Sequence, residues 1–293
     1  MRLSEGQSRR DSGTQFWLVE DAVQRGDVKR ALAHYDILLR THPSTYTTLF
    51  PILVQALGDP AIREALVPYI RTDRNWAPLF LAHASANSAD LGSLVDLMLK
   101  SGGLGDPVAA RAQTVDLLQR LIARNMFADA RRLYLGTRGN IASLLDTASF
   151  TAADPAASAS PMAWQIRTEA DAGGEFIDNG TARPMLSVFA SAATTAAIAS
   201  KILYLPPGRY RLAVALDRFE GDEGSLLRWQ LRCPALPDKR PVWSIDSGNR
   251  PVTADLNIPE RCTVQYLDLI GSGGQGSNGM SATVRSVSLT PIR

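Results

Sequence analysis

The apolar residues of this 293-residue chain change their spacing near position 150. Before it they recur roughly every three to four residues, the spacing of one face of an α-helix. From Trp164 onward they alternate with polar residues, as in a β-strand that buries one face, and Gly and Pro interrupt the runs. The run 149–164 between them is rich in small residues and suits a connection. The pattern predicts an α-helical half and a β-sheet half.

In the first half, turn signals separate apolar stripes over residues 14–146. Asp59 and Asp106 each precede a proline, which is typical of an N-cap followed by the first helical turn. Gly102 stands where a helix would end. We expect a flexible N-terminus over 1–13, followed by about four antiparallel helix pairs stacked in order.

The segment 26–43, GDVKRALAHYDILLRTHP, resembles the second helix of a tetratricopeptide repeat. Ala31 and Tyr35 occupy the small and the aromatic positions of that helix, and Ala130 and Tyr134 form a second partial match. The resemblance implies an all-α, tetratricopeptide-like solenoid whose surface docks a protein partner.

All three histidines, His34, His42 and His83, lie in this helical half. A metal site needs ligands about one helical turn apart with a third ligand nearby, which this spacing does not provide. We expect surface or capping roles for the three imidazoles. The sequence predicts no metal site and no cofactor.

The second half contains roughly eight to ten short strand-like runs, which favours an antiparallel sandwich over a parallel sheet. The clearest pair of strands meets at the turn Pro206–Gly208. We expect the side chains of Trp164 and Trp229 in the core.

Several motifs of residues 147–293 resemble the jelly-roll carbohydrate-binding modules of bacterial proteins. The residues that carry the resemblance are Phe150, Trp164, Gly173-Gly174, Pro207-Gly208-Arg209-Tyr210 and the final strand Val284–Pro291. It implies an all-β antiparallel jelly-roll sandwich that binds glycan. The last strand lacks the Asp pair that holds a structural calcium in many such modules. The joint layout also resembles proteobacterial envelope and exopolysaccharide proteins, which implies a role in polysaccharide synthesis or export.

The chain has two cysteines, Cys233 and Cys262, each on a predicted strand of the β half. We expect a disulfide, which would contribute about 3 to 4 kcal/mol by the loop-entropy estimate. The alternative is two buried thiols. A disulfide indicates an extracytoplasmic protein of the periplasm or cell envelope. The N-terminus shows no signal peptide, and no run could span a bilayer. Because a disulfide implies export, we expect the signal or anchor to lie upstream.

The formal net charge of +2 does not favour nucleic acid as a partner. The basic pairs at 9–10, 131–132 and 239–240 are scattered and lack neighbouring aromatics, so we expect solvated side chains. The run 271–276, GSGGQG, formally fits a dinucleotide fingerprint, but a strand pattern follows it where a helix is required. We interpret it as a flexible connection between strands.

The β half has no histidine that could activate a serine or cysteine nucleophile. Its densest carboxylate cluster comprises Asp217, Glu220, Asp222 and Glu223, which we interpret as a solvated loop, with calcium binding as the alternative. We therefore expect no enzyme. Two carboxylates converging in a cleft would favour a carbohydrate-active enzyme instead.

A glycan site is predicted on the solvent face of the strand that contains Trp229. If Trp229 points inward, Arg228, Gln230 and Arg232 point outward. Gln265 and Thr263 are out of phase with Cys262, so we expect them on the same face, and Trp243 would supply the ring that stacks on a sugar. The alternative is a structural scaffold that binds nothing small.

Overall fold

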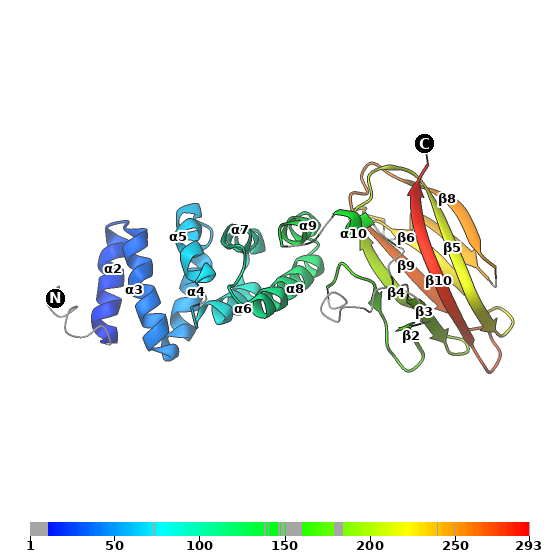
Figure 1. Ribbon diagram of the computed structural model, residues 1–293, viewed down its shortest axis with the longest axis horizontal. Coiled ribbons are helices and arrows are strands. Elements are labelled where there is room, and N and C mark those ends of the chain that lie inside the picture. The colour runs from blue at the N-terminus through cyan, green and yellow to red at the C-terminus, as the bar shows by residue number, and fades with distance from the viewer. Residues whose placement is uncertain are drawn as a thin grey trace. The chain divides into compact units, whose positions relative to one another are not determined.

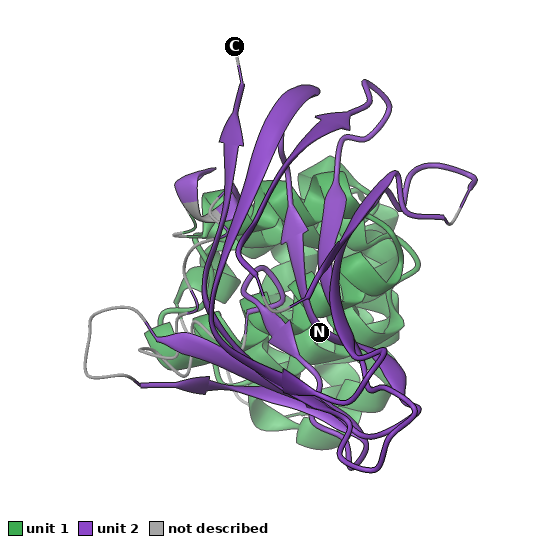
Figure 2. Cartoon of the chain, turned by 90° about the vertical axis from the view of Figure 1, so that its right-hand side faces the viewer, with its two compact units in different colours: residues 1–139 green, residues 140–293 purple. Residues whose placement is uncertain are grey.

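The computed structural model divides the chain into two compact units, Met1–Gly139 and Asn140–Arg293 (Figure 2). It describes residues 11–72, 74–137, 139, 141–145, 147, 150, 160–178, 184–238, 240–248 and 250–292. Arg9, Arg10 and Lys239 of the predicted basic pairs lie outside these residues. So does most of the run 149–164.

The first unit is α-helical throughout its described residues, as the apolar stripes predict (Figure 1). Its helices are α2 (Ser12–Gln24), α3 (Val28–Thr41), α4 (Tyr46–Ala56), α5 (Pro60–Arg71), α6 (Ala77–Asn87), α7 (Leu91–Ser101), α8 (Pro107–Ala123) and α9 (Phe127–Gly136), with a short 3₁₀ turn η1 (Pro43–Thr45). Helices α3, α5, α7 and α9 contact one another in succession, and so do α4, α6 and α8. None of the described helices is long and apolar enough to cross a membrane.

The predicted helix ends are confirmed. Asp59 and Asp106 are N-caps whose carboxylates accept the backbone N–H two residues further on, at 2.8 Å and 3.0 Å respectively. Gly102 ends α7 in the left-handed conformation, with φ of 73°. A left-handed C-cap costs a glycine little because it has no Cβ.

One histidine prediction is wrong. His34 is only 4% exposed, and its Nδ1 lies 2.8 Å from Oε1 of Gln15, which is itself buried between α2 and α3. The neighbouring helix covers this face of α3, so the imidazole is buried with a polar partner rather than solvated. His42 does lie at a helix end, where its backbone N–H donates to the carbonyl of Leu38 at 2.8 Å.

The second unit is a sandwich of two antiparallel sheets, as the alternation predicts. Its strands are β1 (Gln165–Ile166), β2 (Ala172–Ile177), β3 (Met185–Ala190), β4 (Thr195–Leu203), β5 (Gly208–Gly221), β6 (Leu226–Arg232), β7 (Trp243–Ser247), β8 (Val252–Ile258), β9 (Gln265–Ser272) and β10 (Met280–Pro291). One sheet has the order β1-β4-β9-β6-β7 and is called the β9 sheet. The other has the order β2-β3-β10-β5-β8 and is called the β10 sheet.

Three aromatic rings lie at the centre of the sandwich core. The centroids of Phe150 and Trp164 are 5.7 Å apart, and those of Trp164 and Trp229 are 6.3 Å apart in an edge-to-face arrangement. All three side chains are buried, as predicted for the two tryptophans. Edge-to-face contact is a favoured geometry of aromatic pairs.

The division between the units lies earlier than the expected boundary after residue 146. The short helix α10 (Ile141–Leu145) belongs to the second unit, where Tyr204 donates its backbone N–H to the carbonyl of Leu144 at 3.3 Å. Leu145 packs against the sandwich core. Helical spacing places this segment with the helical half, but the contacts of Leu144 and Leu145 place it with the sandwich.

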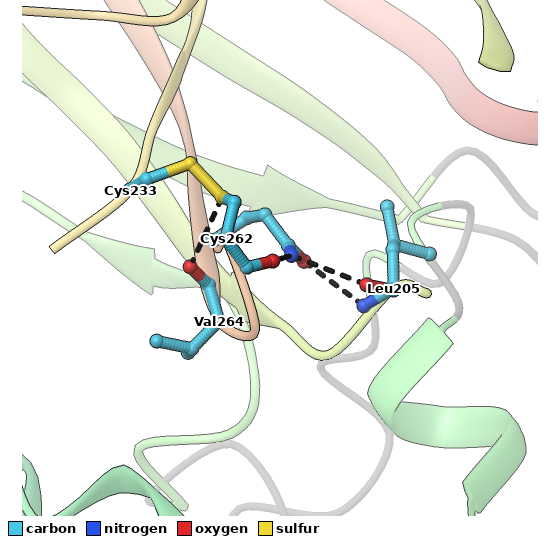
Figure 3. Close-up of a disulfide and its surroundings, with 5 residues drawn as sticks. Leu205, Cys233, Cys262 and Val264 are labelled. Carbon is cyan, nitrogen blue, oxygen red and sulfur yellow. Dashed lines mark hydrogen bonds between the residues drawn. A yellow bond between two sulfur atoms is a disulfide. The ribbon is translucent and has the colours of Figure 1, made fainter. Parts of the chain in front are cut away.

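The predicted disulfide between Cys233 and Cys262 is confirmed (Figure 3). The Cα atoms are 5.5 Å apart, within the usual range for a disulfide. The bridge links the residue after β6 to the turn before β9, and both cysteines are buried. Disulfides persist in oxidising environments outside the cytoplasm.

Asp90 provides a test of helix capping in the first unit. Its carboxylate accepts the Ser93 hydroxyl at 2.6 Å and the Ser93 backbone N–H at 3.1 Å. These bonds hold the pKa of Asp90 below its usual value. A lowered folded-state pKa stabilises the fold above the unfolded-state pKa of about 3.9, and this gain is lost as the pH falls through the folded-state value.

We predict that Asp90→Ala lowers the free energy of unfolding by about 1 kcal/mol at neutral pH, because α7 loses its N-cap. The difference in the free energy of unfolding between wild type and Asp90→Ala should become smaller as the pH falls below about 4, because the wild-type carboxylate then becomes protonated. Urea unfolding at several pH values measures both effects. Asp90→Asn is the control, since its amide oxygen also caps but does not titrate in this range. A wild type and an Asp90→Ala variant equally stable at neutral pH would contradict the capping role.

Candidate functional site

The predicted outer face of β6 exists. Arg228, Gln230 and Arg232 alternate with the buried side chains of Leu227, Trp229 and Leu231. The alternation is the one that the pleat of a half-buried strand imposes. Three of the predicted site residues therefore do lie on one solvent-facing surface, the outer face of the β9 sheet.

These side chains bind protein groups on the same face. Asp268 of β9 is only 1% exposed. Its carboxylate accepts the Ser200 hydroxyl at 2.7 Å, the Gln230 amide at 3.1 Å and the Arg232 guanidinium at 3.0 Å. The bond to Asp268 raises the pKa of Arg232. We call Ser200, Gln230, Arg232 and Asp268 the Asp268 network.

The remaining groups of this face are paired as well. Arg228 donates to Asp246 of β7 at 2.6 Å. The guanidinium of Arg232 lies 5.0 Å from the ring centroid of Tyr266, in cation–π geometry. The network joins β4, β9 and β6 side by side, so its evident role is to hold the sheet together.

Two predicted site residues face the core. Trp243 pairs with Leu231 across β6 and β7, is half-buried and packs against the sandwich core. Gln265 is fully buried: its amide oxygen accepts the Leu205 N–H at 2.9 Å, and its amide nitrogen donates to the carbonyls of Leu205 and Cys262 at 3.2 and 2.5 Å (Figure 3). Neither is available to a sugar on the outer face.

The error at Gln265 has a local cause. Residues 259–264 form a turn, and β9 begins only at Gln265. Cys262, Val264 and Gln265 are all buried, so the alternation counted from Cys262 breaks before the strand begins. The phase of a strand cannot be carried through a turn.

The β10 sheet contains a hollow of about 490 Å³ on its outer face, at the end where β3 and β5 finish and β10 begins. We call it the Phe189 hollow. The residues that line it are Phe189, Ala190, Ser191, Glu220, Gly221, Asp222, Asn278, Gly279, Met280 and Ser281. Its volume lies within the range of small-ligand sites.

Phe189 provides an exposed aromatic surface in this hollow. The side chain is 41% exposed on the outer face of β3, between the buried Val188 and Ala190. Its strand partner on β2 is Gly173, where an added Cβ would lie 3.1 Å from Phe189 Cε1. The ring therefore lies across the backbone of Gly173, and the missing side chain makes room for it.

The glycine-rich run GSGGQG packs against two of the turns that line the hollow. A Cβ at Gly273 would collide with the backbone of Ser191, and one at Gly274 with the backbone of Glu223. Both glycines also make backbone hydrogen bonds with the turn between β3 and β4. Gly271 and Ser272 end β9, and the rest of the run leads toward β10, so the run connects strands as expected, with Gly273 and Gly274 packed between two turns.

Asp222 binds the end of the same loop, just before β10. One carboxylate oxygen accepts the backbone N–H groups of Asn278 and Gly279 at 2.7 Å and 3.0 Å, and the other accepts the Asn278 amide at 3.3 Å. Ser281 lies in register with both Phe189 and Glu220, so β10 places its hydroxyl between the ring and the carboxylate.

Three acidic residues at or beside the hollow have partners. Asp217 pairs with Arg285, Glu220 with Arg218, and Asp222 with the loop described above. Within the described ranges, no group of three His, Cys, Asp or Glu side chains could hold a metal ion. The hollow thus combines an apolar ring with hydrogen-bonding groups.

Sequence reasoning missed Phe189, although a signal was present. In the run PMLSVFA, Leu186, Val188 and Ala190 share one phase, which leaves Phe189 in the solvent phase. An aromatic residue out of phase with the core side chains of its own strand is the observation that would have identified it.

The Asp268 network yields a stability prediction. Asp268→Ala leaves Arg232, Gln230 and Ser200 without their acceptor, so we expect a loss of about 2 kcal/mol in the free energy of unfolding. Asp246→Ala on the same face removes an exposed ion pair and should cost less than about 1 kcal/mol. Guanidinium unfolding of both variants measures the difference. Equal losses would show that burial of Asp268 adds nothing.

Comparison with known proteins concerns the sandwich unit. No protein-family model and no curated protein matches the chain. A solved family 61 carbohydrate-binding module in complex with β-1,4-galactotriose is similar over 44% of this chain and 88% of its own, at 12% identity and a TM-score of 0.30. A family 4 module is similar over 52% of this chain and 100% of its own, at 12% identity and a TM-score of 0.30. A family 11 module from Clostridium thermocellum, in complex with a mixed-linked β-1,3-1,4 tetrasaccharide, is similar over 44% of this chain and 89% of its own, at 10% identity and a TM-score of 0.28.

Proposed function

We propose that this chain is a non-catalytic protein whose sandwich binds a glycan at the Phe189 hollow. The observation that carries the proposal is the exposed Phe189 ring, seated on Gly173 and bordered by Ser281, Glu220 and Asn278. This site replaces the one predicted on the outer face of the β9 sheet.

The chemistry of the hollow matches that of a pyranose ring. One face of a sugar presents C–H groups that pack on an aromatic ring, and its rim presents hydroxyls. The exposed side chains of Glu220, Asn278 and Ser281 offer acceptors and donors around the ring. Arg218 holds Glu220, and Asp222 holds Asn278, before a ligand arrives, which lowers the entropic cost of binding.

The pairing of the acidic side chains supports a non-catalytic role. A glycosidase needs one carboxyl as a proton donor and a second carboxylate near the scissile bond. Asp217 and Glu220 are held by arginines and Asp222 by backbone N–H groups. In this arrangement they act as structural and binding groups.

We propose that the first unit is a degenerate tetratricopeptide-like repeat that docks a protein partner. The exposed large apolar side chains of its described residues all lie on the first helix of a pair: Trp17 and Val23 on α2, Ile52 on α4, Leu79 on α6 and Val108 on α8. We call these five side chains the apolar row, and we propose that the protein partner covers them.

An extracytoplasmic location, in the periplasm or cell envelope, fits the disulfide. Combined with a glycan-binding sandwich and a docking unit, it favours a place in polysaccharide synthesis or export. In that role the first unit would hold the chain on a protein complex while the second unit contacts the polymer.

A glycan array followed by titration calorimetry tests the sandwich site. We expect the full chain to bind a glycan, and Phe189→Ala to weaken binding at least tenfold through loss of the stacking ring. Phe189→Tyr keeps the ring and should retain binding. Arg228→Ala, on the outer face of the other sheet, is the control and should change nothing. Undiminished binding by Phe189→Ala would exclude this hollow.

The docking surface is tested by changing two residues of the apolar row. We expect the double variant Ile52→Asp, Leu79→Asp to lose a protein partner that wild type retains on an affinity column, because the partner would have to desolvate two carboxylates. Ala61→Asp, an exposed change on α5 outside the row, should retain it. Unchanged thermal unfolding verifies that the fold is intact. A double variant that retains the same partner would exclude the row.

A further inference from the structure

The charge of the Phe189 hollow selects among glycans. Its ionisable lining residues are Glu220 and Asp222, and no described lysine or arginine lines it. A ligand in this hollow therefore meets two carboxylates, one of them paired with Arg218, beside an aromatic ring. This observation extends the proposed glycan function to a class of sugar.

The two carboxylates do different work. Both oxygens of Asp222 accept hydrogen bonds from the Asn278–Gly279 segment, so this side chain fastens the loop. Glu220 is exposed, and Arg218 donates to its Oε1 alone, from Nε at 3.0 Å and from Nη2 at 2.5 Å. Oε2 of Glu220 has no partner among the described residues. Arg218 thus orients the carboxylate and leaves one oxygen available to a ligand.

The register of the sheet sets the distance from this oxygen to the ring. Phe189 and Glu220 both pair with Ser281, on opposite sides of β10. Their Cα atoms are therefore two strand spacings apart, about 10 Å. A glycan of at least a disaccharide can stack one residue on Phe189 and place a substituent of the next residue at Glu220, with Ser281 between them.

We propose that the hollow prefers glycans with free, non-acetylated amino groups, one ammonium group binding Oε2 of Glu220 while a neighbouring sugar ring stacks on Phe189. An ammonium group on a carboxylate makes a charge-assisted hydrogen bond, stronger than the one a neutral hydroxyl or acetamide makes. A uronate would place a third carboxylate beside Glu220 and Asp222 and is disfavoured. The inference rests on the proposed glycan site.

Titration calorimetry of the full chain tests this preference with three tetrasaccharides. One is built of glucosamine, the second of N-acetylglucosamine and the third of galacturonate. The titrations are run at about pH 6, where the amino groups of the glucosamine oligomer carry positive charge. We expect the glucosamine oligomer to bind about five- to tenfold more tightly than the acetylated one, and the uronate most weakly. Added salt should reduce the preference.

Two matched variants isolate the carboxylate. For Glu220→Gln, the dissociation constants of the glucosamine oligomer and its acetylated form should differ by no more than about twofold. Glu223→Gln, an exposed acid on the adjacent turn that does not line the hollow, should keep the full preference. Since both changes are isosteric and exposed, circular dichroism should show an unaltered fold.

The outcomes separate the two proposals. If neutral and amino-bearing oligomers bind equally, and Phe189→Ala weakens both, the charge preference is overturned while the glycan site stands. A preference that Glu220→Gln leaves intact also overturns the assignment. If no glycan binds, or if binding is independent of Phe189, the proposed function fails together with the inference.

Discussion

Close approach of backbones is the constraint on which the candidate site depends. The loop before β10 passes between the turn that follows β3 and the turn that follows β5, and any side chain at Gly273 or Gly274 would collide with their backbones. Glycine is the residue that permits such contact. Because three loops are locked together, the ends of β3, β5 and β10 keep fixed positions, and the ring and carboxylate they carry keep a fixed separation. The Asp222 carboxylate also binds this loop, because it accepts the backbone N–H groups of Asn278 and Gly279.

The two sheets use their polar side chains differently. On the β9 sheet, Asp268 is buried under Arg232 and Gln230, and the neighbouring Arg228 is paired with Asp246. Hydrogen-bonding capacity there is satisfied within the protein, so a ligand would have to displace protein partners. On the β10 sheet, Phe189 and one oxygen of Glu220 are left available. The contrast explains why the outer face of the β9 sheet is the weaker candidate for recognition.

Much of the fold could be predicted from the sequence, because periodicity reports which face of an element is buried. It predicted the helical half, the antiparallel sandwich, the buried Trp164 and Trp229, and the disulfide partners. It failed where a local pattern depends on a distant neighbour. His34 is buried because Gln15 of another helix covers it, and α10 belongs with the sandwich because of contacts with β4. The prediction for Gln265 was wrong because a turn precedes β9, so the alternation of buried and exposed residues counted from Cys262 does not continue into the strand. Phe189 could have been found from its own strand, but its role needed the register that places it beside Gly173 and Ser281.

Glu220 and Asp222 show why residue type alone cannot assign a role. They lie two positions apart in one acidic run, and the sequence treats them alike. Asp222 points to N–H groups of the neighbouring loop, which consume both of its oxygens. Glu220 is still on β5, where the arginine two residues earlier shares its face and takes one oxygen only. The end of the strand between them therefore separates a structural carboxylate from one that can meet a ligand. Since Ser281 is in register with both Glu220 and Phe189, the strand register, and not the acidic run alone, sets which carboxylate lies on the same face as the ring.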